Sequence, residues 1–316
     1  MTSGSLLIVK PGLLTTVQDL GRFGYQSAGV PVAGPMDAFS HRVANQLAGN
    51  DPDAATLEIT LIGPDVIVEA ETTIAVAGAL FEVTCDDRLV PAGTSFTVQR
   101  GQRIKFGRIQ QGARAYLAVA GGVQTGPVLG SRATHLVSHM GGYSGRALVS
   151  GDRVPIASGL PQRPPRKAAG LMLPSKGRAL LRVIAGPQAD WFESEALKTI
   201  AGVSFRISPQ SNRMGYRLQG PPITQVHEGE LISEPVGIGA IQVPSAGEPI
   251  LLMADRQTAG GYPKIGYVIT ADLPLAGQLA PGDFIEFNLC TPQEAMTALI
   301  SRERQLLRVS DLRGVP

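Results

Sequence analysis

The sequence is poor in the features that mark several specialised classes of protein. It has 2 cysteines in 316 residues, which excludes a disulfide framework and fits a reducing compartment. Its formal net charge is +2, so no strong field favours nucleic acid or an anionic membrane as a partner. The longest stretch without a charged residue, 115–131, contains glycine, proline, glutamine and threonine, which is unlike a membrane span. The apolar run 6–9 is too short for a signal peptide, so we expect a cytoplasmic protein.

Glycine and proline, in contrast, are abundant, with 38 and 24 residues, which favours a turn-rich and mostly β fold. Short β-branched segments bounded by turn residues indicate strands at 66–68, 81–84, 95–98 and 103–106. The sequence Asp86-Asp87-Arg88 between two such segments predicts a hairpin turn. Many short strands at regular intervals predict closed or sandwiched β units.

The chain shows signs of an internal duplication. Gly34-Pro35-Met36-Asp37 opens a helix-like apolar pattern that ends at Gly49, and Gly186-Pro187-Gln188 opens a second pattern that ends at Gly202. The segment 157–177 between them holds four prolines and reads as a semi-extended linker. We therefore expect an N-terminal domain at 1–156, a linker at 157–177 and a related C-terminal domain at 178–316. A capping box at Thr291–Glu294 predicts a C-terminal helix to about Arg308.

Familiar catalytic signatures are missing. The sequence has no phosphate-binding Gly-x-x-x-x-Gly-Lys-Ser/Thr loop, no Gly-x-Ser-x-Gly elbow and no dinucleotide fingerprint. If the protein uses ATP, we expect another chain to hold most of the nucleotide. His135 and His139 have the i, i+4 spacing of metal ligands, but the surrounding glycine and serine disfavour a helix. We therefore expect no metal site.

Three polar segments are the best candidates for a functional site: 15–22, 211–217 and 254–263. Each places arginine, a carboxylate or amide, a hydroxyl and glycine within seven to ten residues. Solvated turns held by local ion pairs would have a similar composition. The functional interpretation is one shared pocket, in which arginine forks bind a carboxylate or oxyanion and side-chain amides bind an amide substrate.

The candidate residues follow from this interpretation. The catalytic candidates are Arg256, Arg213, Asp255 and Asp19, and the substrate-binding candidates are Gln18, Arg22, Asn212, Tyr216, Gln242, Gln257 and Tyr262. Asp255 and Arg256 follow the apolar run 250–253, which reads as a buried strand, and would point to opposite faces if the strand continued. We expect Arg256 to bind substrate charge and Asp255 to anchor the turn.

These segments belong to a series of motifs that runs through nearly the whole chain. The motifs are TTVQDLGR, GVPVAGPMDAFS, ANQLAGN, LEITLIGP, YLAVAGGV, VLGSRAT, SPQSNRMGYRLQG, GAIQVPSAGEPI and ADRQTAGGYP. The series resembles the KipA / allophanate-hydrolase-subunit-2-like family, also described as the carboxyltransferase domain, subdomains A and B, of urea carboxylase. The sequence departs from the family pattern at Ser233-Glu234-Pro235 and at Ala259, which puts substrate preference in doubt more than fold.

The resemblance implies two related cyclophilin-like β-barrel domains with a few short helices and a C-terminal helix. It is closest to the bacterial 5-oxoprolinase members, which implies ATP-dependent hydrolysis of 5-oxoproline to glutamate by a chain that is inactive alone. The implied partners are a KipI-like (subunit-B-type) cyclophilin-like protein and a LamB/YcsF-like (subunit-A-type) protein. Two alternatives stay open: a component of a biotin-dependent carboxyltransferase, whose biotinyl lysine would lie in another chain, and a KipA-type regulatory module that binds a histidine-kinase inhibitor.

Overall fold

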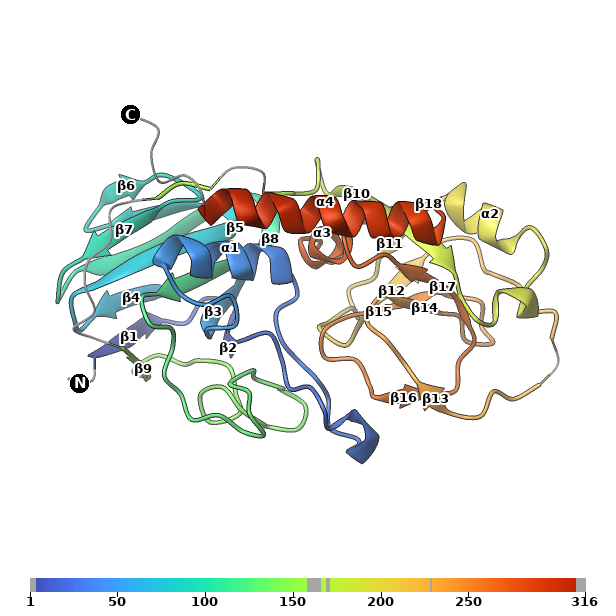
Figure 1. The fold of residues 1–316 in the computed structure, drawn as a ribbon, viewed down its shortest axis with the longest axis horizontal. Helices are drawn as coiled ribbons and strands as arrows, with labels where there is room; N and C mark the ends of the chain where they lie inside the picture. Colours follow the sequence, from blue (N-terminus) through green and yellow to red (C-terminus); the bar gives the residue numbers. More distant parts are fainter. Residues whose placement is uncertain (1–3, 158–165, 169–170, 228, 311–316) are drawn as a thin grey trace. The chain divides into compact units, whose positions relative to one another are not determined.

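A computed structural model describes residues 4–157, 166–168, 171–227 and 229–310 (Figure 1). The chain divides into two compact units. The N-terminal unit comprises Met1–Arg22, Ala33–Leu173 and Arg304–Pro316, and the C-terminal unit comprises Phe23–Val32 and Pro174–Glu303. Within the described residues, no helix is long and apolar enough to cross a membrane.

The N-terminal unit is built on a nine-stranded sheet. Its strands are β1 (Gly4–Lys10), β2 (Leu14–Gln18), β3 (Thr56–Thr60), β4 (Asp65–Val68), β5 (Thr72–Cys85), β6 (Arg88–Val90), β7 (Ser95–Val98), β8 (Arg103–Val119) and β9 (Arg153–Ile156). They follow the order β2-β3-β8-β4-β1-β9, while β5 pairs with β6, β7 and β8. The apolar side chains of these strands form one buried core, which includes Leu57, Val66, Leu117 and Val154.

Helix α1 (Ala38–Ala48) packs on β5 and β8 through a second apolar cluster that contains Phe39, Val43 and Leu47. The predicted helix is present, but it begins at Ala38, three residues after the proline that was expected to open it. Asp37 is the N-cap, because its side chain accepts a hydrogen bond from the Ser40 N–H. Gly49 ends the helix in the left-handed conformation, as predicted.

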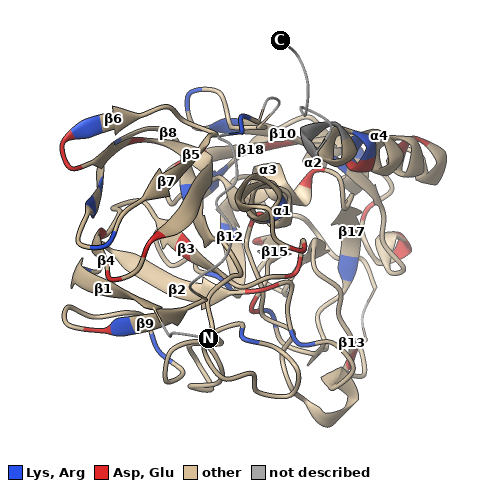
Figure 2. Cartoon of the chain, turned by 60° about the vertical axis from the view of Figure 1, so that its left-hand side comes forward, with Lys and Arg blue, Asp and Glu red and all other residues tan. Residues whose placement is uncertain are grey.

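The predicted hairpin turn joins β5 to β6. Asp86 and Asp87 both have positive φ angles, 45° and 66°, and Cys85 pairs directly with Arg88. Two residues with positive φ give the backbone twist that matches the flanking strands. Figure 2 shows this acidic turn beside the basic residue that opens β6. The hairpin prediction is confirmed.

The C-terminal unit is a closed seven-stranded barrel, ordered β10-β17-β14-β15-β12-β11-β18. Its strands are β10 (Arg178–Ala185), β11 (Ser204–Ile207), β12 (Gly215–Gln219), β14 (Ala240–Gln242), β15 (Ile250–Leu252), β17 (Lys264–Val268) and β18 (Phe284–Leu289). Two short strands, β13 (Glu234–Pro235) and β16 (Ala259–Gly260), pair with each other apart from the barrel. Alternation in β12 buries Tyr216 and Leu218 and turns Arg217 outward.

The helices of the C-terminal unit differ in part from expectation. The pattern that ends at Gly202 is not one helix but two pieces, η2 (Ala189–Trp191) and α2 (Ala196–Ala201). Between them Phe192 is extended and pairs with Gln225, which interrupts the helical hydrogen bonding. The remaining helices are η1 (Gln26–Ala28), α3 (Leu273–Gly277) and α4 (Pro292–Ser310).

The C-terminal helix is confirmed together with its capping box. The Glu294 carboxylate accepts from the Thr291 N–H at 2.7 Å, and the Glu294 N–H donates to Thr291 Oγ1 at 3.2 Å. Near its end, Leu306 joins the apolar cluster of α1. The hydrophobic period 295–307 was therefore a reliable signal for a helix of 19 residues.

The predicted fold class, mainly β with two barrel domains and a C-terminal helix, is confirmed. One unit is a closed barrel, and the other is a half-barrel sheet. Residues 158–165 and 169–170 of the expected linker lie outside the described residues. Its residues 166–168 pair with the N-terminal unit, since the Ser95 N–H donates to the Arg166 carbonyl and Lys167 bridges to Thr94.

Candidate functional site

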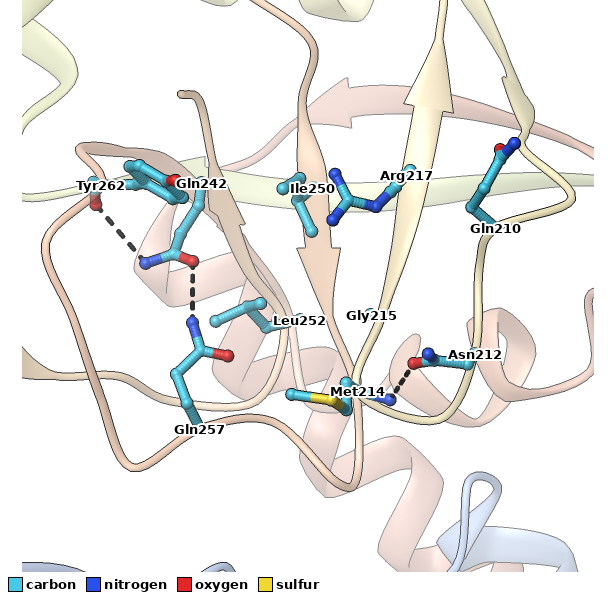
Figure 3. A pocket seen from close by; sticks show the side chains of 10 residues that line it. All are labelled: Gln210, Asn212, Met214, Gly215, Arg217, Gln242, Ile250, Leu252, Gln257 and Tyr262. Atoms are coloured by element: carbon cyan, nitrogen blue, oxygen red, sulfur yellow. Dashed lines mark hydrogen bonds between the residues drawn. The ribbon is translucent and has the colours of Figure 1, made fainter. Parts of the chain in front are cut away.

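A pocket of about 230 Å³ lies on the outer face of the C-terminal barrel (Figure 3). It is lined by Gln210, Asn212, Met214, Gly215, Arg217, Gln242, Ile250, Leu252, Gln257 and Tyr262. Strands β12, β15 and β14 form its floor, and the loops 210–214 and 257–262 form its walls. Two of the three polar segments predicted from the sequence therefore meet here.

Strand register arranges three outward-facing side chains of the barrel in one row. Arg217 pairs with Ile250, and Ile250 pairs with Gln242. Beyond Gln242 the register shifts, and Lys264 pairs with Gln242 across this irregularity. Directly paired residues place their side chains on the same face of a sheet. The row thus runs from a guanidinium, over an apolar side chain, to an amide.

Hydrogen bonds to the backbone fix which end of each side-chain amide in the pocket is the oxygen and which is the nitrogen. The Tyr262 carbonyl can only accept, so it takes a hydrogen bond from Gln242 Nε2, at 3.5 Å. Gln242 Oε1 then accepts from Gln257 Nε2 at 3.2 Å, which leaves Gln257 Oε1 as an acceptor (Figure 3). On the other wall, Asn212 Oδ1 accepts from the Met214 N–H at 2.8 Å, which leaves Asn212 Nδ2 as a donor. The pocket therefore offers an amide acceptor, at Gln257, and an amide donor on the opposite wall, at Asn212, where Gln210 also keeps its Nε2 as a donor because its Oε1 accepts from the Ser208 hydroxyl.

Arg213 and Asp255 lie next to this pocket but are occupied with each other. Arg213 Nε and Nη2 donate to the two Asp255 carboxylate oxygens, both at 2.9 Å, and both residues are buried. The Asp255 N–H also donates to the Arg213 carbonyl, so side chain and backbone hold the two loops together. This geometry suits the expected anchoring role of Asp255.

Arg256 has different surroundings. Its Nε donates to the Val236 carbonyl at 3.3 Å, and it has no carboxylate within ion-pair distance among the described residues. Burial lowers the pKa of the Arg256 guanidinium. A half-buried cation without a counter-ion is a candidate for binding an anion.

Tyr216, also expected at the site, lies on the other side of its strand. Its side chain is buried in the barrel, and its hydroxyl donates to the Leu279 carbonyl at 3.2 Å. The structure does not bring Tyr216 into the pocket. The alternation of β12 explains this placement. Successive side chains of a strand point to opposite faces, so Tyr216 faces the barrel interior and Arg217 faces outward.

The remaining candidates, Gln18, Asp19 and Arg22, belong to the N-terminal unit. Asp19 accepts from the Gly21 N–H, the Ser131 hydroxyl and the Arg132 N–H, so it anchors the loop 128–134. Arg22 is fully buried and donates to the carbonyls of Val128 and Ala133, at 2.8 and 2.9 Å.

Two polar atoms of this group have no hydrogen-bond partner among the described residues: Gln18 Oε1 and Arg22 Nη1. Burial lowers the pKa of Arg22, and the nearby Asp19 charge opposes that shift. Their contacts position a loop, and their part in substrate binding stays a prediction.

Sequence reasoning missed two residues of the outer face. Arg217 was part of a candidate segment but was not selected, and the alternation of its strand was the signal that could have identified it. Lys264, which is 1% exposed, donates through Nζ to Glu234, and Gln188 Nε2 donates to the same oxygen at 2.8 Å. The hydrogen bond from Lys264 lowers the pKa of Glu234. Lys264 and Glu234 lie far apart in the sequence, so no local sequence pattern predicts their ion pair.

Candidate metal ligands do not cluster. Within the part of the chain that the structure describes, no group of three or more histidine, cysteine, aspartate or glutamate side chains could hold an ion. His135 shares a hydrogen bond of 2.7 Å with the Ser138 hydroxyl, and it lies in a turn rather than a helix.

Comparison with known proteins shows close relatives over the full length of the chain. The chain is 40% identical to the C subunit of 5-oxoprolinase from Escherichia coli (strain K12) over 299 residues. This match covers 95% of this chain and 96% of the relative. The crystal structure of the Kluyveromyces lactis urea carboxylase matches 99% of this chain with a TM-score of 0.91 and 31% identity. The structure of TTHA0988 matches 90% with a TM-score of 0.82 and 37% identity.

The chain spans 30% of the length of the urea carboxylase and about half, 55%, of the length of TTHA0988. A family model described as "Carboxyltransferase domain, subdomain A and B" matches residues 28–289. The chain therefore belongs to the family of the carboxyltransferase domain, subdomains A and B.

Proposed function

We propose that this chain is the C subunit of a 5-oxoprolinase, which opens the lactam of 5-oxoproline to give glutamate. The observation that carries the proposal is the pocket on the C-terminal barrel, where Gln257 Oε1 is left as an acceptor and Asn212 Nδ2 as a donor. A lactam presents both an N–H donor and a carbonyl acceptor, so each of these two groups can bond to it. The identity to the C subunit of the E. coli 5-oxoprolinase supports the same reaction.

The site residues divide the work as follows. The Gln257 oxygen accepts the lactam N–H, and the Asn212 amide donates to the lactam carbonyl. Arg256, a half-buried guanidinium with no ion-pair partner among the described residues, lies beside the pocket without lining it; in the assembled enzyme it would turn toward the substrate and bind the negative charge that develops when the carbonyl is attacked. Asp255 holds Arg213 and the loop that carries Arg256 and Gln257.

ATP is the co-substrate in this proposal. Transfer of its terminal phosphoryl group to the lactam oxygen, with release of ADP, would activate the carbonyl carbon toward water. The ring C–N bond then breaks with the proton going to the nitrogen, and a second water releases phosphate and leaves glutamate. The sequence has no nucleotide-binding loop, so a partner chain holds most of the nucleotide. The partners are a KipI-like and a LamB/YcsF-like protein. The chain alone is then inactive, because it supplies a substrate pocket without the group that activates the substrate.

One alternative has its own supporting observation. The match to the urea carboxylase structure, with a TM-score of 0.91, supports a carboxyltransferase that moves a carboxyl group between biotin and an amide. The same amide donor and acceptor would serve an amide nucleophile. The two functions differ in the co-substrate, and this difference makes them separable by assay.

The experiment is reconstitution from purified components. The chain is mixed with its two partner proteins, 5-oxoproline and ATP, and the formation of glutamate and ADP is measured. We expect turnover with all three proteins and none when any one is omitted. Turnover by this chain alone, or complex formation without turnover of 5-oxoproline, would contradict the proposal. A parallel assay with biotin carboxylase, biotin carrier and urea tests the alternative.

A further inference from the structure

Arg217 is the charged residue of the pocket on the C-terminal barrel. Among the described residues that line this pocket, the other nine are uncharged. The Arg217 side chain is exposed, and it makes no ion pair or side-chain hydrogen bond with any described residue. Figure 3 shows its guanidinium reaching across the strands toward Ile250. It is therefore free to bind a ligand anion inside the pocket.

The other two arginines of this region are less suited to that task. Arg213 has both ends of its fork on Asp255, so its charge is already compensated. Arg256 lies next to Gln257 in sequence, but it is bonded to the Val236 carbonyl and does not line the pocket. A carboxylate that enters the pocket meets Arg217 first.

The strand register sets the distance between this cation and the amide-binding groups. Arg217, Ile250 and Gln242 are successive members of one cross-strand row. Because neighbouring strands lie about 4.8 Å apart, the backbones of Arg217 and Gln242 are about 10 Å apart. The Arg217 guanidinium extends toward the apolar Ile250, and the Gln242 carboxamide on the other side of Ile250 is bonded to Tyr262 and Gln257 (Figure 3). The row fits a small ligand that has a carboxylate at one end, a few carbon atoms in the middle and an amide at the other end.

We infer that Arg217 is a specificity-determining residue, which selects amides that carry a carboxylate over neutral amides such as urea. The inference rests on the proposed function for its amide-binding half. The planar guanidinium fork matches a carboxylate with two parallel hydrogen bonds, which a lysine ammonium cannot form. Arg217 therefore makes the pocket one for cyclic amino-acid amides rather than for urea.

The test measures binding by the full chain, so it does not require turnover. Isothermal titration compares L-5-oxoproline, 5-oxoprolinamide, in which a neutral carboxamide replaces the carboxylate, and urea. We expect 5-oxoproline to bind about tenfold or more tightly than 5-oxoprolinamide, since hydrogen bonds to a charged group contribute about 1.5–3 kcal/mol. In Arg217→Gln the affinity for 5-oxoproline should fall to that for 5-oxoprolinamide, which should itself change little. Arg217→Lys should give an intermediate value.

The matched control is Arg206→Gln, which removes another exposed arginine from the neighbouring strand β11 without touching the pocket. It should leave every affinity unchanged. If the wild-type chain does not discriminate between 5-oxoproline and 5-oxoprolinamide, or if Arg217→Gln still discriminates, the inference is wrong. If discrimination depends on Arg217 but the reconstituted complex turns over no 5-oxoproline, the inference stands and the proposed function fails.

Discussion

The buried ion pair between Arg213 and Asp255 determines what the neighbouring Arg256 is left to do. A buried pair is favourable only when both charges are present and well bonded, and here both fork nitrogens of Arg213 meet carboxylate oxygens. Arg256 shares the loop but not the counter-ion. At the scale of single residues, the site therefore separates a structural cation from one that can bind a substrate charge.

The first prediction concerns Asp255→Asn. The change leaves the Arg213 charge buried without its partner, so we expect the free energy of unfolding to fall by about 3–5 kcal/mol. Chemical denaturation of the two proteins at one pH measures the difference. Asp87→Asn, which removes a carboxylate from an exposed ion pair with Lys105, is the control and should change stability by less than about 1 kcal/mol. An Asp255→Asn protein as stable as the wild type would show that the pair does not anchor the loop.

The second prediction concerns Arg256→Lys in the reconstituted complex. The change keeps the charge but loses the fork, so we expect a loss of about 2–4 kcal/mol of transition-state stabilisation, measured as kcat/KM. The melting temperature should change little, because the Arg213–Asp255 pair that anchors the loop is intact. Near-normal turnover by this variant would remove Arg256 from the mechanism.

The sequence predicted the residue types of the site better than their partners. Gln242, Gln257 and Asn212 were identified because amide side chains suit an amide substrate, and the structure places all three in one pocket. Arg217 was missed although the alternation of its strand marks it as outward-facing, because a local pattern does not say which outward-facing residues border a pocket. That choice is made by the closure of the barrel, which depends on strands far away in the chain.

At the scale of elements, the short strand β16 matters because its glycine lets the carboxamides approach. A Cβ atom on Gly260 would lie 2.9 Å from Gln242 Nε2 and 3.2 Å from Gln257 Nε2. Both contacts are closer than side chains normally allow, and both are with the flexible ends of side chains. An alanine there would therefore move the two amides without unfolding the barrel.

The third prediction follows from this close approach. In Gly260→Ala the hydrogen bond between Gln257 and Gln242 is broken, so Gln257 Oε1 is no longer held as an acceptor. We expect 5-oxoproline binding to weaken by about 1 kcal/mol, roughly fivefold, with little change in melting temperature. Gly126→Ala is the control, because a Cβ atom at Gly126 meets nothing within 4 Å. Equal affinities for the two variants would show that the amide pair does not contact the ligand.

Elements with local signals were predictable, and those fixed by distant contacts were not. The hairpin at Asp86-Asp87 and the helix that starts at Thr291 carry turn and cap chemistry within four residues, and both are present. The helix expected from Pro187 is interrupted at Phe192, because that residue pairs with Gln225 more than thirty positions later. Pairing over such a distance outweighs the local helical period.

At the scale of the whole molecule, several groups make the fold less stable in acid. Arg146 donates to both oxygens of Asp152 and lowers the pKa of that carboxyl, and the Thr291 N–H lowers the pKa of Glu294. A carboxyl with a lowered pKa stabilises the fold above its unfolded pKa, and this contribution is lost as the pH falls through the folded value. The stability that these carboxyl groups contribute is lost only below about pH 4. A different group must therefore account for any loss of stability at milder acidity.

His41 is that group, and it carries the last prediction. It is fully buried beside Thr56 and Asn45, and burial lowers its pKa from 6.5 to about 3. Between these two values the unfolded chain binds a proton that the folded chain does not, so stability falls as the pH falls, by up to about 1.4 kcal/mol per pH unit. Between about pH 7.5 and about pH 5, the wild type should therefore lose about 2 kcal/mol more than His41→Gln, measured by urea denaturation. Because the carboxyl groups are common to both proteins, their contribution cancels in this difference. Equal losses in the two proteins would show that His41 takes up a proton without unfolding.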